Sequence, residues 1–169
     1  MTDDLKWSEV ILVKITVTLY LLLLLLGLTI TALLEAQQQW LAGSPELQLG
    51  VRCAMAGGFG GLTYCLRAVY LNASVRKSWD AAWVPWYFIR PFVSMIVGAV
   101  SYVFLKAGLF VLQSEHQPTA SPIGFLALAF IAGLNVDRFI TKLEDLAQAT
   151  WGIRPSRTAE ASEQQDQPR

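Results

Sequence analysis

The chain has 169 residues, of which 54% are hydrophobic and only 15% are charged. Soluble domains carry roughly a quarter charged residues, so this composition argues against a soluble domain and indicates a membrane protein. The length fits one domain, because four spans and their short loops use nearly the whole chain.

Four apolar stretches follow one another along the chain, at Ile11–Leu34, Val51–Leu71, Val84–Leu112 and 120–140. A bilayer core of about 30 Å needs ~20 apolar helical residues, which the first three stretches supply. We therefore predict an all-α fold, a four-helix transmembrane bundle within a membrane domain at 1–153.

The first stretch follows Lys6 and could be taken for a signal peptide. The apolar region of a signal peptide is about 7–15 residues long and ends in a small-x-small cleavage site. Here the stretch is longer, and Leu34 stands where a small residue is needed. We expect a retained first span, rich in leucine and facing lipid.

Small residues recur four positions apart in the other three stretches and predict close helix packing. The candidate packing residues are Gly57, Gly61, Ser94, Gly98 and Gly133. The two cysteines, Cys53 and Cys65, lie about three turns apart on one helix, so we expect two buried thiols without a disulfide or a metal site.

The third stretch contains Pro91, which either lies in the first helical turn or bends a helix that begins near Val84. The fourth continues as an amphipathic cytoplasmic extension to about residue 151, where Gly152 and Pro155 end it. We expect 154–169 to be a disordered tail, because it contains almost nothing apolar.

Basic residues alternate between connections, and such residues face the cytoplasm. The connections at 35–50 and 113–121 contain no Lys or Arg, whereas the second connection and the C-terminal part hold several. Tryptophan clusters near the predicted ends of the spans agree with this arrangement. We therefore predict that both termini lie in the cytoplasm.

A carboxylate is costly within a membrane and needs a partner. Asp137 stands near the end of the fourth stretch, at a depth similar to that of Arg67, with Arg90 nearer the inner surface. We hypothesise a polar cluster of Asp137 with Arg67 or Arg90, adjoined by Asn135 and Arg138. The alternative is that these charges reach the lipid headgroups separately.

The second half of the chain contains a series of short motifs: Trp86-Tyr87, Arg90-Pro91, Gly98, Tyr102, Ala107-Gly108, Ala132-Gly133 and Arg138-Phe139. This series resembles a set of uncharacterised bacterial four-span inner-membrane proteins. The resemblance implies location in a bacterial inner membrane and carries no activity.

No catalytic, metal-binding or phosphate-loop motif is present, so we expect no enzyme activity and no cofactor. The sequence favours a non-catalytic adaptor, sensor or accessory subunit that binds a cytoplasmic protein through 72–83 and 137–151. The alternative is an oligomeric ion channel or transport-like pore. Besides the lipid bilayer, we expect a homo-oligomer, with a monomer as the alternative, and no nucleic-acid partner.

Overall fold

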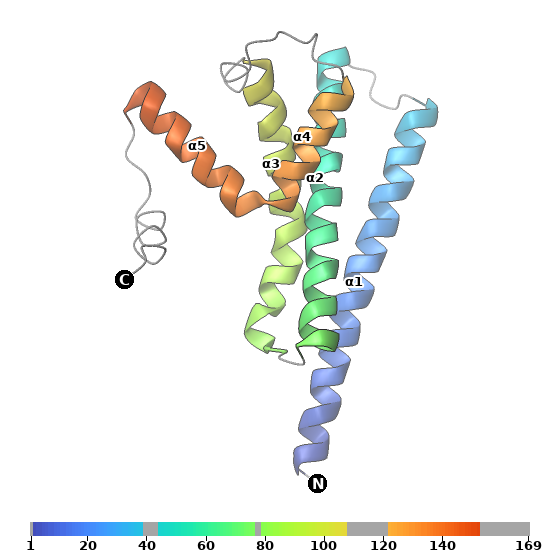
Figure 1. Cartoon of the computed structure of the whole chain (residues 1–169). Coiled ribbons are helices and arrows are strands. Elements are labelled where there is room, and N and C mark those ends of the chain that lie inside the picture. The colour runs from blue at the N-terminus through green and yellow to red at the C-terminus, as the bar shows by residue number, and fades with distance from the viewer. Residues whose placement is uncertain (1, 39–43, 77–78, 108–121, 153–169) are drawn as a thin grey trace. The chain divides into compact units, whose positions relative to one another are not determined.

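The computed structural model describes residues 2–38, 44–76, 79–107 and 122–152, except the side chains of 2–9, 38 and 81. Its α-helices are α1 (Thr2–Gln38), α2 (Pro45–Tyr70), α3 (Val84–Lys106), α4 (Pro122–Leu134) and α5 (Val136–Trp151) (Figure 1). A π-helix, η1 (Leu71–Val75), continues α2, and a 3₁₀ helix, η2 (Ala81–Trp83), precedes α3. The all-α prediction is confirmed for these residues. The predicted tail, 154–169, lies outside them.

The chain divides into two compact units, one ending at Leu134 and the other beginning at Asn135. The first unit contains α1 to α4, and the second contains α5. The predicted boundary after residue 153 falls just beyond the described residues.

Two described helices are long and apolar enough to cross a membrane, at Val10–Gln37 within α1 and at Val84–Lys106. A third candidate span is obtained when α4 and α5 are counted together as one bent span. Helix α2 is not among them, since its many glycines add little hydropathy and Arg52 and Arg67 lie in its sequence. The composition of α1 and α3 is that of a membrane protein.

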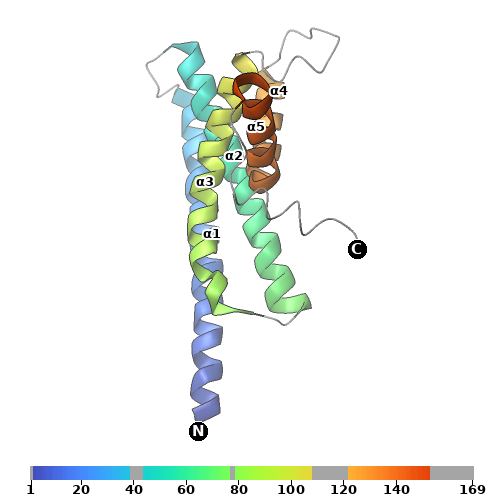
Figure 2. The same cartoon turned by 90° about the vertical axis from the view of Figure 1, so that its left-hand side faces the viewer.

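Helix α2 is the central helix of the first unit, in contact with α1, α3 and α4. Figure 2 shows α1 and α3 running beside α2, with the first turns of α1 extending beyond the ends of both. Large apolar side chains on the outer face of α1, such as Leu23 and Leu33, are exposed. A helix that its neighbours shield from lipid can be less apolar than the helices around it.

The ends of α2 and α3 follow from local sequence. Ser44 caps α2, where its Oγ accepts a hydrogen bond from the backbone N–H of Leu47 at 3.4 Å, and Pro45 begins the helix. Helix α3 begins at Val84, so Pro91 lies inside it rather than in its first turn.

The fourth apolar stretch is broken at Asn135, which corrects the expectation of one helix continuing to about residue 151. Asn135 has φ −120° and ψ 50°, outside the helical region, and asparagine forms helices poorly. Its carbonyl accepts the N–H of Phe139 at 2.9 Å and so starts α5. Gly152 ends α5 in the left-handed conformation, with φ 68°, as glycine does at helix C-termini.

Candidate functional site

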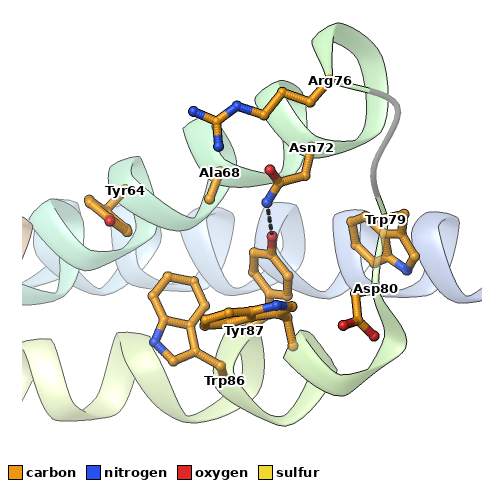
Figure 3. Close-up of a pocket in the computed structure, with 9 residues that line it drawn as sticks. Tyr64, Ala68, Asn72, Arg76, Trp79, Asp80, Trp86 and Tyr87 are labelled. Atoms are coloured by element: carbon orange, nitrogen blue, oxygen red, sulfur yellow. Dashed lines mark hydrogen bonds between the residues drawn. The ribbon is translucent and has the colours of Figure 1, made fainter.

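Aromatic and charged side chains gather where α2 ends and α3 begins. Helix α2 passes into η1 there, and the N–H of Arg76 reaches the carbonyl of Leu71 at 2.8 Å, five residues back. Such π-turns widen a helix and are frequent at functional sites. Here Asn72 Nδ2 donates a hydrogen bond to the hydroxyl of Tyr87 on α3, at 3.2 Å (Figure 3).

The opposite wall is a series of aromatic rings. The rings of Trp79 and Tyr87 stack with centroids 5.6 Å apart and planes 3° apart. Trp86 meets Tyr87 edge to face at 5.2 Å and Trp83 at 6.3 Å. Helix α1 joins this wall through Lys14, whose Nζ lies 5.8 Å from the centre of the Trp79 ring. Offset and edge-to-face pairs of this kind stabilise one another beyond the area that they bury.

Arg90 lies behind this wall and is only 5% exposed. Its guanidinium carbon is 5.1 Å from the centre of the Tyr64 ring and 5.3 Å from that of Trp86. Both distances are within the range of cation–π attraction, which strengthens when the cation is desolvated. The Tyr64 and Trp86 rings therefore both contact one buried positive charge.

Two adjoining cavities lie here, the first between α2–η1 and the aromatic wall and the second along α2–η1 alone, and they share Tyr64, Ala68, Asn72 and Arg76. The first has a volume of about 340 Å³, and Asp80 and the aromatic wall complete its lining. The second has a volume of about 280 Å³ and is completed by Arg67 and Leu71. We call them the aromatic cavity and the arginine cavity. In Figure 3 the side chain of Arg76 extends back along the helix toward Ala68.

The two cavities differ in the charged side chains that line them. Arg67 and Arg76 are both exposed, and neither forms an ion pair with a carboxylate of the described residues in the first unit. The carboxylate of Asp80 in the aromatic cavity accepts the backbone N–H of Ala82 at 2.9 Å. The arginine cavity therefore has two cationic side chains and no acidic one in its lining.

The structure divides the hypothesised polar cluster between the two units. Arg67 and Arg90 belong to the first unit, where Arg67 lines a cavity with Tyr64 and Arg90 contacts the Tyr64 ring. Asn135, Asp137 and Arg138 belong to the second, where the carbonyl of Asp137 accepts a hydrogen bond from Thr141 at 3.1 Å. Because the placement of the units relative to each other is not defined, the pairing of Asp137 stays a prediction.

The predicted packing residues lie where α2, α3 and α4 meet. A Cβ added to Gly57 would contact the Ser94 carbonyl oxygen and lie 2.8 Å from the Cα of Gly98. A Cβ on Gly61 would meet the side chain of Ser94, and one on Gly133 would meet the backbone of Gly57. The hydroxyl of Ser94 donates to the carbonyl of Gly133 at 3.0 Å. Backbone contacts thus fill this part of the bundle.

Sequence reasoning missed the site as a unit. It assigned the tryptophans to the membrane interface, considered Asn72 only as part of the partner-binding segment 72–83, and did not consider Tyr64. One signal was available: on a helix, Tyr64, Ala68 and Asn72 recur at four-residue spacing and share a face. Both cysteines are buried and free, as expected.

No group of three or more His, Cys, Asp or Glu side chains among the described residues could hold a metal ion. Comparisons of the chain with protein-family models, with curated proteins and with solved structures gave no match. The site's own geometry is therefore the basis for any functional assignment.

Proposed function

We propose that the chain is a non-catalytic adaptor, sensor or accessory subunit of a bacterial inner membrane. In this proposal it crosses the bilayer four times with both termini in the cytoplasm, and it binds a cytoplasmic protein. The observation that carries the proposal is the concentration of polar features at one end of the first unit. That end contains both cavities together with Arg67, Arg76 and Asp80.

The proposed topology makes this the cytoplasmic end. Cysteine labelling at Gln38 and Gln117 tests it, because both positions should react with an impermeant reagent from outside the cell. Reaction of either position only after permeabilisation would reject the four-span arrangement.

The amphipathic helix α5 supports a second contact with the partner. Its sequence places Phe139, Leu143 and Leu146 on one side and exposed polar residues on the other, where Lys142 and Asp145 form an ion pair at 3.4 Å. A helix of this pattern binds a groove in a partner or lies in the membrane interface.

The interior of the first unit gives little support to a pore through a single chain. Helices α2, α3 and α4 approach to backbone contact at Gly57, Gly98 and Gly133. The buried hydroxyls of Ser94 and Ser101 are hydrogen-bonded to backbone carbonyls rather than open to a channel. These internal contacts also support the monomeric alternative over a homo-oligomer, which mass determination in nanodiscs would test.

Site-specific photo-crosslinking in cells tests the adaptor function. A photoreactive residue at Val75 or Lys142, both exposed, should give one protein adduct of defined mass. The matched control is Ile96, which is 63% exposed in the middle of α3 and should give no protein adduct. Absence of adducts from the first two positions would contradict the adaptor, and ion flux by the purified protein in liposomes would favour the pore.

A further inference from the structure

The arginine cavity has the composition of an anion-binding site. Arg67 and Arg76 line it, with Asn72 and Tyr64 as further hydrogen-bonding groups and no carboxylate in the lining. An anion between two guanidinium groups that line one cavity offsets their mutual repulsion. Guanidinium binds phosphate oxygens well, because its planar fork donates two parallel hydrogen bonds.

A third positive charge lies close by and adds to the field of the cavity. Arg90 is held over the ring of Tyr64, which lines both cavities. Asp80 is the one acidic residue lining either cavity, and it belongs to the aromatic cavity. The net charge at the site is positive, which favours an anionic ligand over a zwitterion.

The position of the cavities indicates the source of that anion. Helix α3 is a candidate span that begins at Val84, directly after Trp83, so the aromatic wall lies at the end of a span. Tryptophan and tyrosine gather at the depth of the lipid headgroups. At that depth the most concentrated anions are phospholipid phosphates, which attract clustered basic side chains near the membrane surface.

We propose that the arginine cavity binds the phosphate of an anionic phospholipid, with the rest of the headgroup against the aromatic cavity. Arg67 and Arg76 hold the phosphate oxygens, and Trp83, which is 57% exposed, lies beside the glycerol region. Lipid binding at this site does not depend on the proposed adaptor function, because it requires only that the first unit lies in a membrane.

The full-length protein in detergent, titrated with phosphatidylglycerol or phosphatidylcholine, tests the proposal by native mass spectrometry. Phosphatidylglycerol should bind more tightly and with 1:1 stoichiometry. Each arginine within reach of an anionic headgroup contributes about 1 kcal/mol, so Arg67→Gln and Arg76→Gln should each weaken binding about fivefold. The two changes together should remove most of the preference over phosphatidylcholine.

Two further variants keep the result interpretable. The control is Lys106→Gln, which removes one exposed cation at the other end of α3 and should leave binding unchanged. The double variant Arg67→Lys, Arg76→Lys retains the charge without the planar fork and should retain part of the affinity.

Three outcomes would overturn the proposal. The first is an unchanged lipid preference in the double glutamine variant with a native circular dichroism spectrum. The second is an equal loss in Lys106→Gln, which would indicate diffuse attraction. The third is displacement of the lipid by equimolar inorganic phosphate or glycerol phosphate, which would assign the site to a soluble anion.

Discussion

Arg52 donates through Nε to both carboxylate oxygens of Glu35 at 3.0 Å, and its Nη2 lies 2.9 Å from Oε1. The Glu35 side chain is only 8% exposed, whereas that of Arg52 is 38% exposed. The pair joins the C-terminal part of α1 to the beginning of α2. It lies outside the region where we predicted a polar cluster.

Glu35→Gln should lower the stability of the first unit. Exposed ion pairs contribute about 0–1 kcal/mol and breaking a buried pair costs about 3–5 kcal/mol, so this half-buried pair should cost about 1–3 kcal/mol. Thermal unfolding in detergent measures the loss. Glu46→Gln is the matched control, since the Glu46–Lys106 pair is exposed and its loss should be nearly silent. Equal effects of the two changes would contradict this prediction.

Gly133→Ala should destabilise the bundle, whereas Gly124→Ala in the same helix should not. A methyl group at Gly133 meets the backbone of Gly57, which cannot move aside as a side chain can, while nothing lies within 4 Å of the Cβ position of Gly124. Overpacking costs about 1–3 kcal/mol, and alanine in place of an exposed helical glycine stabilises by up to about 1 kcal/mol. Unfolding midpoints of the two variants should therefore shift in opposite directions.

The hydrogen bond between Asn72 and Tyr87 couples the π-helix to α3, and a double-mutant cycle measures it. Asn72→Ala and Tyr87→Phe should each cost about 0.5–1.5 kcal/mol, and the second change should add almost nothing to the first. Additive losses would show that the bond contributes no stability. Trp83→Phe should leave the coupling energy unchanged, because Trp83 has no part in this bond.

The pairing of Asp137 remains open to a direct test, and the size of the effect identifies the partner. Arg90 is buried, so Asp137→Ala should cost about 3–5 kcal/mol when Arg90 is the partner. Arg67 is exposed, so the cost should be about 0–1 kcal/mol when Arg67 is the partner. A charge exchange with the true partner should restore part of the loss. If Asp137→Ala leaves stability unchanged and no charge exchange with Arg67 or Arg90 changes it either, the polar-cluster hypothesis is rejected.

The helices and their close contacts could be predicted from the sequence, because hydropathy and small-residue spacing are local signals. Gly57 and Gly98 were identified by spacing alone and do meet in the structure. The break at Asn135 was missed, since apolar residues continue on both sides of it and the expectation relied on their periodicity. An asparagine between glycine-containing and charged turns was a weak signal in the sequence.

The candidate site was harder to predict because its parts lie on three segments. Arg67 and Arg90 were selected as partners for a carboxylate, and the contacts of Arg90 with the Tyr64 and Trp86 rings were not foreseen. Cation–π contacts have no fixed sequence spacing. The Glu35–Arg52 pair was missed for a related reason: each residue was judged as the edge of its own predicted span, although the two are only 17 positions apart in the sequence.

The enclosure of α2 has a consequence for biosynthesis. On the four-span topology, α2 reaches the insertion machinery after α1 has entered the bilayer. Helix α2 is less apolar than the candidate spans α1 and α3, and its neighbours α3 and α4 are still to be made at that stage. We therefore expect α2 and α3 to enter together as a hairpin. Because the C-terminal end of α1 faces outward in this topology, a nascent chain cut short after Arg76 should leave α2 accessible to protease on the outer side of the membrane, while one that continues past Lys106 should protect it.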